Sequence, residues 1–258
     1  MMYDVACRML HATTYHSSLA QTQFTRFTKT PQFRNFIAVS NPYLNMESAS
    51  PKSPFHPSCL EGKVALVTGG GSGICYAVTQ QLLLHGCSTA VILGRRLSFL
   101  QSSADALSKA TGKRVLYQSC DVRNPEACMA AVKYTIEHCG KLDILINGAA
   151  GNFLAEAKNL RPKGFKTVME IDTMGTYNMC YAAYKYLAES KGSVINISAT
   201  LQYGATWYQV HASAAKSAND SMTRTLALEW GIDRIRVNGI APGKSFFSCK
   251  HLLSYLLP

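Results

Sequence analysis

Short apolar runs alternate with longer mixed stretches from residue 60 to residue 243. The first run, Val64–Thr68, has the length of a strand and ends at a row of glycines. A run that is apolar at successive positions is typical of a strand buried on both faces of a sheet. Five similar runs follow it. The predicted strands are 64–68, 89–93, 114–119, 142–147, 193–197 and 235–240.

The stretches between these runs are predicted to be helices, and glycines mark several of their ends. Gly86, Gly112, Gly140 and Gly231 each close such a stretch, and glycine is favoured just beyond a helix C-terminus. Regular alternation of strand and helix predicts an α/β fold, a doubly wound parallel sheet of the Rossmann-type three-layer sandwich. The predicted helices are 73–86, 97–111, 124–139, 164–190 and 207–230.

The two ends of the chain do not follow this alternation. Residues 1–57 contain few acids, frequent Ser and Thr, and no helical or strand period. This low-order N-terminal extension has the composition of an organelle transit peptide. Alternatively it is an unstructured tail without an address, and Met46 is then a sensible alternative start. Residues 244–258 form a divergent apolar tail, so the readable fold covers 58–243.

Composition narrows the class of protein. Of the 258 residues, 47% are hydrophobic and 16% are charged, which excludes a largely disordered chain. No uncharged apolar run reaches the roughly 18 residues that a membrane-spanning helix needs. The net charge of +11 suits a phosphorylated ligand, whereas nucleic acid is disfavoured because the sequence lacks zinc-finger spacing and a dense Lys/Arg block. Nine irregularly spaced cysteines indicate reduced thiols, and no metal site is predicted.

A glycine-rich turn follows the first predicted strand and opens the first predicted helix. Glycines let the backbone turn tightly and approach a pyrophosphate, which the N–H groups of the helix N-terminus then bind. The alternative is a plain tight turn. Cys75 stands where such loops carry another glycine, so we expect its side chain to loosen the packing of helix on strand. The residues predicted to bind the cofactor here are Gly69, Gly70, Gly71, Ser72, Gly73 and Ile74.

The residues after the second and third predicted strands bear on the choice of nucleotide. Arg95 and Arg96 stand where an NAD site usually has an acid. Guanidinium groups bind phosphate bidentately, so this pair favours NADP(H) with its 2′-phosphate; otherwise the arginines are solvated at a helix start. Asp121, followed by Val122, is placed to accept a hydrogen bond from the adenine amino group, or else to cap the next helix.

Several motifs now coincide in order and spacing, and together they resemble the short-chain dehydrogenase/reductase family over about residues 58–243. The resemblance implies an NADP-binding reductase domain. It also implies that Asn147, Lys216, Pro242 and Gly243 contact the cofactor. The motifs are 68–73, 147–151, 172–175, 213–216 and 236–243.

The catalytic positions depart from the usual pattern of that family. Ala212 stands where the family has a catalytic Tyr, Ala199 where it has a Ser, and Asp172 where it has an Asn. Of the four usual residue types, Lys216 alone remains. These replacements are similar to those of the 2,4-dienoyl-CoA reductases, and most of all to their peroxisomal branch.

That resemblance implies NADPH-dependent reduction of a 2,4-dienoyl-CoA to a 3-enoyl-CoA, which prepares unsaturated acyl chains for β-oxidation. Asp172 and Lys216 would hold the water that delivers the proton, and Arg123 and Phe153 would contact the acyl-CoA substrate. In simpler interpretations Asp172 is a satisfied buried residue, Arg123 is solvated and Phe153 packs in the core. His211 is less favoured as an acid, because it is one residue off the face of Lys216.

Two alternatives to this enzyme remain open. One is a non-catalytic NADP-binding isoform, and the other is an acyl-thioester reductase of the same family with a different substrate. The family continues past Gly243 with a cofactor-covering loop, a lid and a seventh strand, so we expect this chain to lack them and its sixth strand to be an exposed edge. Full-length members are expected to be homo-oligomers. The resemblance implies the peroxisome, although the C-terminal signal is missing; a transit-like extension or the cytoplasm are the alternatives.

Overall fold

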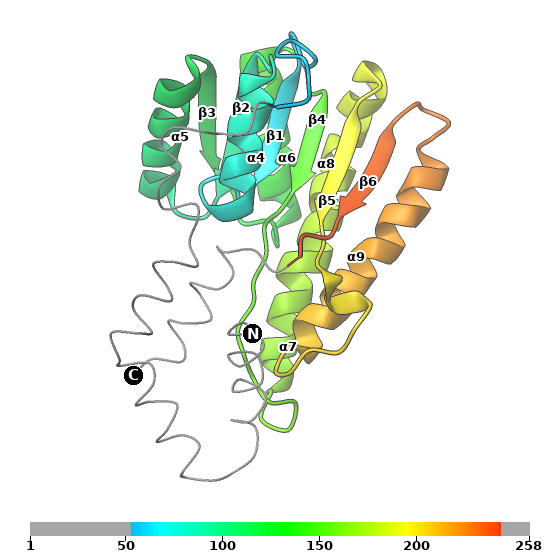
Figure 1. Cartoon of the computed structure of the whole chain (residues 1–258). Helices are drawn as coiled ribbons and strands as arrows, with labels where there is room; N and C mark the ends of the chain where they lie inside the picture. Colours follow the sequence, from blue (N-terminus) through cyan, green and yellow to red (C-terminus); the bar gives the residue numbers. More distant parts are fainter. Residues whose placement is uncertain (1–52, 244–258) are drawn as a thin grey trace. The chain divides into compact units, whose positions relative to one another are not determined.

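The computed structural model describes residues 53–243, and these form a six-stranded parallel sheet with helices on both faces (Figure 1). The strand order is β3-β2-β1-β4-β5-β6. The chain therefore starts in the middle of the sheet and builds one half after the other, which confirms the doubly wound α/β fold. The strands are β1 Val64–Thr68, β2 Thr89–Gly94, β3 Arg114–Ser119, β4 Ile144–Asn147, β5 Ser193–Ile197 and β6 Arg236–Ile240.

Two separate apolar clusters flank the sheet. Leu66 of β1 belongs to the cluster under α6, α8 and α9, whereas its neighbours Ala65 and Val67 belong to the cluster under α4 and α5. All of β1 is buried, which explains why its sequence is apolar at successive positions. The helices are α4 Gly73–Leu84, α5 Leu97–Thr111, α6 Pro125–Cys139, α7 Pro162–Met169, α8 Gly175–Ser190 and α9 Val210–Glu229.

Glycines end two of the helices as predicted. Gly112 after α5 and Gly140 after α6 have φ values of 66° and 76°, in the left-handed region that side chains disfavour. At the other end of α6, the Asn124 side chain accepts the Ala127 N–H at 2.9 Å. Asn124 is thus the N-cap, and Asp121 does not take that role.

Two predicted helices are wrong in ways that matter for the site. The stretch 164–190 is not one α-helix, because a π-helical turn over Glu170–Met174 separates α7 from α8. The stretch 207–230 begins three residues later than predicted, at Val210. Tyr208 has φ 65°, a left-handed conformation that an α-helix does not contain.

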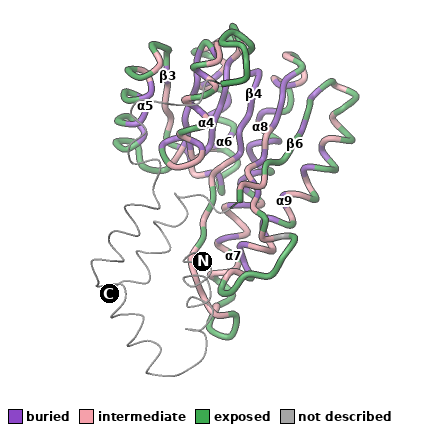
Figure 2. Tube along the Cα trace, in the orientation of Figure 1, coloured by how far each residue is buried: buried purple, intermediate pink, exposed green. Residues whose placement is uncertain are grey.

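One end of the described sheet is more open than the rest. Arg236, Asn238 and Ile240 of β6 are exposed, whereas every residue of β1 is buried (Figure 2). Within residues 53–243, β6 pairs only with β5, so it forms an edge of the described sheet. The expectations for residues 1–52 and 244–258 lie outside the described residues.

Candidate active site

The phosphate loop leaves the carboxyl end of β1, where the strand order reverses between β1 and β4. Gly69 has φ 69°, and Gly73 has φ 58°. A Cβ on Gly70 would lie 2.6 Å from Ile92 Cγ2, and one on Gly69 would lie 3.0 Å from the Gly148 carbonyl oxygen. Glycine is therefore required in this loop for two reasons. Neighbouring atoms leave no room for a Cβ, and the backbone at Gly69 and Gly73 has a positive φ. A dinucleotide would meet bare backbone here, at the crevice where such ligands bind in doubly wound sheets.

The start of α4 is free to bind an anion. Ser72 occupies the N-cap position in an extended conformation, and its side chain makes no capping hydrogen bond. The first N–H groups of α4 thus lack a side-chain acceptor, as a pyrophosphate site requires. Ser72 is exposed and Ile74 is half-buried. The predicted phosphate-binding residues fit a nicotinamide dinucleotide.

Cys75 does not loosen the packing of α4 on the sheet, contrary to expectation. Its side chain is buried and points at Gly148, where an added Cβ would lie 2.0 Å from the sulfur. The glycine at 148 leaves the space that the thiol fills. Burial raises the pKa of Cys75 to about 11, against an opposing effect of Lys216, so this thiol stays neutral.

Thr68 connects the phosphate loop to the loop after β4. Its hydroxyl oxygen accepts the N–H groups of Gly148 at 2.9 Å and of Ala149 at 3.0 Å. Sequence reasoning assigned no role to Thr68 or Gly148 in this contact, because their partners are about 80 residues apart and no local pattern marks them.

Arg95 and Arg96 are both exposed at the end of β2. The Arg96 guanidinium carbon lies 4.5 Å from the centre of the Phe99 ring, and this contact holds the side chain near the strand end. Neither arginine forms a salt bridge among the described residues. The pair is thus available to a phosphate, as the NADP prediction requires.

Asp121 and Arg123 contact each other. The Arg123 Nε donates to Asp121 Oδ1 at 2.9 Å and to Oδ2 at 3.1 Å. Hydrogen bonding to Arg123 lowers the pKa of Asp121. Val122, between them, is buried against Gly175. The residue predicted for adenine and the residue predicted for substrate are therefore neighbours in space.

Asp172 and Lys216 meet beneath the carboxyl ends of the strands. Asp172 Oδ2 lies 3.2 Å from Lys216 Nζ, and Oδ1 accepts the Gly151 N–H at 2.7 Å. Lys216 also donates to the Ile197 carbonyl oxygen at 3.0 Å. Asp172 is 1% exposed. The structure thus brings together the two predicted catalytic residues, which are 44 positions apart in the sequence.

The π-helical turn presents the Asp172 side chain to Lys216. Such turns widen the helix locally and are frequent at functional sites. A π-helical turn disturbs the regular hydrogen bonds of the helix backbone. Side chains compensate at Asp172, whose carbonyl oxygen accepts hydrogen bonds from Thr176 Oγ1 at 2.6 Å and from Asn219 Nδ2 at 3.1 Å. Burial raises the pKa of Asp172, while Lys216 and the Gly151 N–H oppose that rise. A buried carboxyl group with a perturbed pKa is a common feature of functional sites.

Asn147 faces the interior. Its Nδ2 donates to Asn196 Oδ1 at 2.9 Å and to Cys180 Sγ at 3.3 Å. Asn196 in turn donates to Thr223 Oγ1 at 2.8 Å. This buried chain of polar groups ties β4 and β5 to α9, so a contact of Asn147 with the cofactor stays a prediction.

The remaining predicted residues lie in the segment after β4, at the start of α9 and after β6. Phe153 is half-buried, and its ring centre lies 4.5 Å from that of His211. Ala212 is buried beside His211, so this position offers no phenol. Pro242 and Gly243 follow β6 at the end of the described residues.

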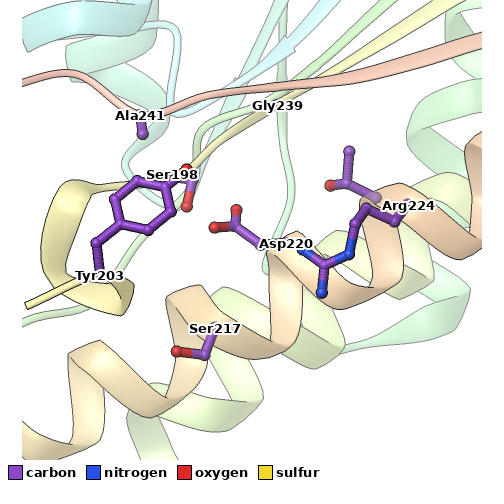
Figure 3. Close-up of a pocket in the computed structure, with 8 residues that line it drawn as sticks. Ser198, Tyr203, Ser217, Asp220, Arg224, Gly239 and Ala241 are labelled. Carbon is purple, nitrogen blue, oxygen red and sulfur yellow. The ribbon is translucent and has the colours of Figure 1, made fainter.

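Two cavities lie beside elements that contribute residues to the candidate site. A cavity of about 430 Å³ lies between α9 and β6, and Ser198, Tyr203 and Asp220 line it (Figure 3). None of the residues predicted to bind the cofactor, to contact the substrate or to catalyse the reaction lines it. A second cavity, of about 370 Å³, is lined by Phe153, Leu160 and neighbouring residues of α7. Phe153 is thus the predicted substrate residue that borders a cavity.

Comparison with known proteins now identifies the family. Residues 63–245 match the family described as short chain dehydrogenase. The chain belongs to the short-chain dehydrogenase family. Members of this family bind nicotinamide cofactors, NAD or NADP. A solved relative, NAD⁺-bound xylitol dehydrogenase, has a TM-score of 0.71 and 25% identity, with 75% of this chain and 76% of that chain covered.

The resemblance to dienoyl-CoA reductases is also confirmed. This short-chain dehydrogenase is 53% identical to the (3E)-enoyl-CoA-producing peroxisomal 2,4-dienoyl-CoA reductase of Arabidopsis thaliana, over 74% of this chain and 67% of that protein. It is 50% identical to the zebrafish (Danio rerio) protein of the same name, over 73% of this chain and 63% of the relative. The chain thus spans about two thirds of the length of these relatives. Within residues 53–243, no helix is long and apolar enough to cross a membrane.

Proposed function

We propose that this protein is an NADPH-dependent 2,4-dienoyl-CoA reductase, which converts a 2,4-dienoyl-CoA to a 3-enoyl-CoA in the breakdown of unsaturated fatty acids. The observation that carries the proposal is the buried pair of Asp172 and Lys216 beside an alanine at position 212. The names of the relatives support it. The same names support a peroxisomal location, and the family resemblance supports a homo-oligomer.

Reduction of a conjugated thioester makes different demands from reduction of a ketone. A ketone reductase must protonate an alkoxide, which a phenol does well. In a dienoyl thioester, the negative charge develops on the thioester oxygen, and the proton goes to the α-carbon, which is bonded to the thioester carbonyl carbon. A water molecule held by a carboxyl group and an ammonium group suffices for that transfer, so the absence of a Tyr at position 212 is consistent with the reaction.

Each residue of the pair has a separate task in this proposal. Bound NADPH supplies a hydride to the far end of the conjugated system. Lys216 holds the Asp172 carboxylate, and its ammonium group would also hydrogen-bond the ribose of bound cofactor. Asp172 orients the water that delivers the proton, and the hydroxide that remains takes a proton from the Asp172–Lys216 pair, which regains it from solvent. Arg123 and Phe153 contact the acyl-CoA.

Recognition of NADPH is assigned to the glycine loop and to residues at the strand ends. Backbone N–H groups at the start of α4 bind the pyrophosphate. Arg95 and Arg96 bind the 2′-phosphate, and Asp121 accepts from the adenine amino group. Val122, Asn147, Pro242 and Gly243 line the rest of the cofactor site.

Replacement of the central carboxyl group tests the proposal. Asp172→Ala is expected to lower turnover of a 2,4-dienoyl-CoA by at least about 100-fold, the usual loss for a general acid or base. NADPH binding, followed by the cofactor's fluorescence, should stay within about twofold, because the phosphate loop is untouched. Asp105→Ala, at an exposed carboxyl group on α5, is the control and should change neither quantity.

Two outcomes would contradict the proposal. Unchanged turnover in Asp172→Ala would remove Asp172 from the mechanism. NADPH binding by the wild type without loss of NADPH absorbance in the presence of a dienoyl-CoA would favour the alternative, a cofactor-binding chain without reductase activity.

A further inference from the structure

The segment after β4 is held against the start of α9 by a row of hydrogen bonds, which we call the clasp. Its members are the residues just after Gly151 and the residues at the N-terminus of α9. The bonds are Asn152 Nδ2 to Gln209 Oε1 at 2.9 Å, His211 Nε2 to the Phe153 carbonyl oxygen at 2.9 Å, and Ala155 N to the Tyr208 carbonyl oxygen at 3.0 Å.

The bond to His211 differs from the others because its side chain is completely buried. His211 is 0% exposed, whereas the bond between Asn152 and Gln209 is exposed to solvent. The Phe153 oxygen can only accept, so Nε2 of His211 carries the hydrogen. The other ring nitrogen, Nδ1, has no hydrogen-bond partner among the described residues. The clasp therefore selects one tautomer of the imidazole.

The clasp connects directly to the catalytic pair. Gly151, two residues before Phe153, donates its N–H to Asp172 Oδ1 at 2.7 Å. Asp172 pairs through Oδ2 with Lys216, which lies on α9 five residues after His211. A continuous series of contacts thus connects His211 to Lys216. It passes through the Phe153 carbonyl, the backbone to Gly151 and the Asp172 carboxylate, and α9 joins its two ends.

The backbone is strained at Tyr208, just before α9 and next to these contacts. Tyr208 has φ 65°, a conformation that costs a bulky residue free energy and persists only where the surroundings enforce it. Its carbonyl oxygen accepts the Ala155 N–H. The start of α9 is therefore shaped to meet the segment after β4.

We propose that His211 is a positioning residue: its Nε2–H fixes the Phe153 carbonyl, and thereby holds the Gly151 N–H on the Asp172 carboxylate. His211 transfers no proton in the reaction. The inference rests on the proposed function for Asp172, and it adds a residue whose side chain acts through the backbone of another segment.

Three variants separate the hydrogen bond from the ring. His211→Gln places an amide nitrogen where Nε2 lies and keeps the donor. His211→Phe keeps a ring for stacking on Phe153 but removes the donor. Asn152→Ala removes the exposed bond of the clasp and serves as the matched control.

We expect kcat/KM for a dienoyl-CoA to fall about tenfold or more in His211→Phe, since a buried carbonyl loses its donor and the catalytic geometry loosens. His211→Gln should stay within about threefold of the wild type, and Asn152→Ala within about twofold, because an exposed bond contributes little. NADPH binding should be unchanged in all three.

The pH dependence gives a readout that a merely structural role would not move. The titratable groups facing Asp172 are Lys216 and His211, both from α9, and the Gly151 N–H lowers its pKa. Loss of that N–H raises the pKa of Asp172. The limb of the kcat/KM profile that reports ionised Asp172 should therefore shift further to higher pH in His211→Phe than in His211→Gln, which keeps the Gly151 N–H in place and loses only the direct effect of the imidazole on Asp172.

Hydrogen exchange at the Gly151 amide tests the clasp without any turnover. Exchange should be at least about tenfold faster in His211→Phe than in the wild type or in His211→Gln, because a lost bond exposes the amide to opening. If wild-type protein does not reduce a dienoyl-CoA, the proposed function fails, but the exchange rate of the Gly151 amide still tests the role of the clasp.

Several results would overturn the inference. Equal loss of activity in His211→Gln and His211→Phe would mean that the imidazole itself does chemistry. Unchanged Gly151 exchange in His211→Phe would break the link to Asp172. A lower melting temperature with unchanged kcat/KM and an unchanged pH profile would leave His211 as a core residue.

Discussion

The glycine loop after β1 and the buried pair of Asp172 and Lys216 lie at the same ends of the parallel strands, yet they are stabilised in different ways. The loop depends on the absence of side chains, since a Cβ at Gly70 would meet Ile92 at 2.6 Å. The pair depends on buried polar groups, with Asp172 held by Lys216 and the Gly151 N–H. Added side-chain atoms therefore disrupt the glycine loop, whereas loss of a hydrogen-bonding or charged partner disrupts the buried pair.

The largest expected effect is at the pair. Lys216→Met leaves the buried Asp172 carboxylate without its cation, and loss of one partner of a buried pair costs about 3–5 kcal/mol of unfolding free energy. Lys133→Met is the control, because Lys133 and Glu137 form an exposed pair at 3.7 Å and such pairs contribute about 0–1 kcal/mol. Urea unfolding at neutral pH measures both.

The pH dependence of Lys216→Met follows from the raised pKa of Asp172. Without Lys216, the folded-state pKa lies further above the unfolded value, so the ionised group destabilises the fold at neutral pH. Protonation relieves that cost, and the deficit against wild type should shrink as the pH falls through the folded-state pKa. A deficit that is constant with pH would mean that Asp172 is satisfied without Lys216.

An intermediate effect is expected where the phosphate loop meets the loop after β4. Gly148→Ala puts a Cβ 2.0 Å from the Cys75 sulfur, and overpacking of this kind costs about 1–3 kcal/mol. The double variant with Cys75→Gly should recover most of that loss, since the thiol is removed. Thermal unfolding of the two single variants and the double variant measures the coupling, and additive losses would show that the two residues are independent.

The smallest expected effect is at the exposed arginines. Replacing Arg95 and Arg96 by Ala should raise the Kd for NADPH about tenfold, which corresponds to about 1.4 kcal/mol. Binding of NADH should be unchanged, because that cofactor has no 2′-phosphate. Equal losses for both cofactors would assign the arginines to the fold or to another part of the nucleotide.

The two regions also differ in how far the sequence predicts them. The apolar run of β1 and the glycines after it lie within ten residues, so local conformation and packing act on the same stretch. The predicted limits of β1, α5, β3 and β5 agree with the structure. The motif resemblance also predicted that Asp172 and Lys216 belong to one site.

Features that depend on distant partners were not predicted. The π-helical turn at Glu170–Met174 lies inside a stretch with ordinary helix-forming residues, and Asn219 satisfies it from another helix. The left-handed Tyr208 has no glycine-like signal in the sequence. The fit of Cys75 to Gly148 joins positions 73 apart, and the sequence marks Cys75 only as a departure from the usual glycine pattern.

The central position of β1 has a consequence for the order in which the protein folds. β1 pairs with β2 on one side and with β4 on the other, where Ala65 lies opposite Ile144. One hydrogen-bonding edge of β1 therefore stays unpaired until a segment about 80 residues later has been synthesised. Such long-range parallel pairing slows folding, so a ribosome-bound chain that ends before residue 144 is expected to need a chaperone over its first three strands.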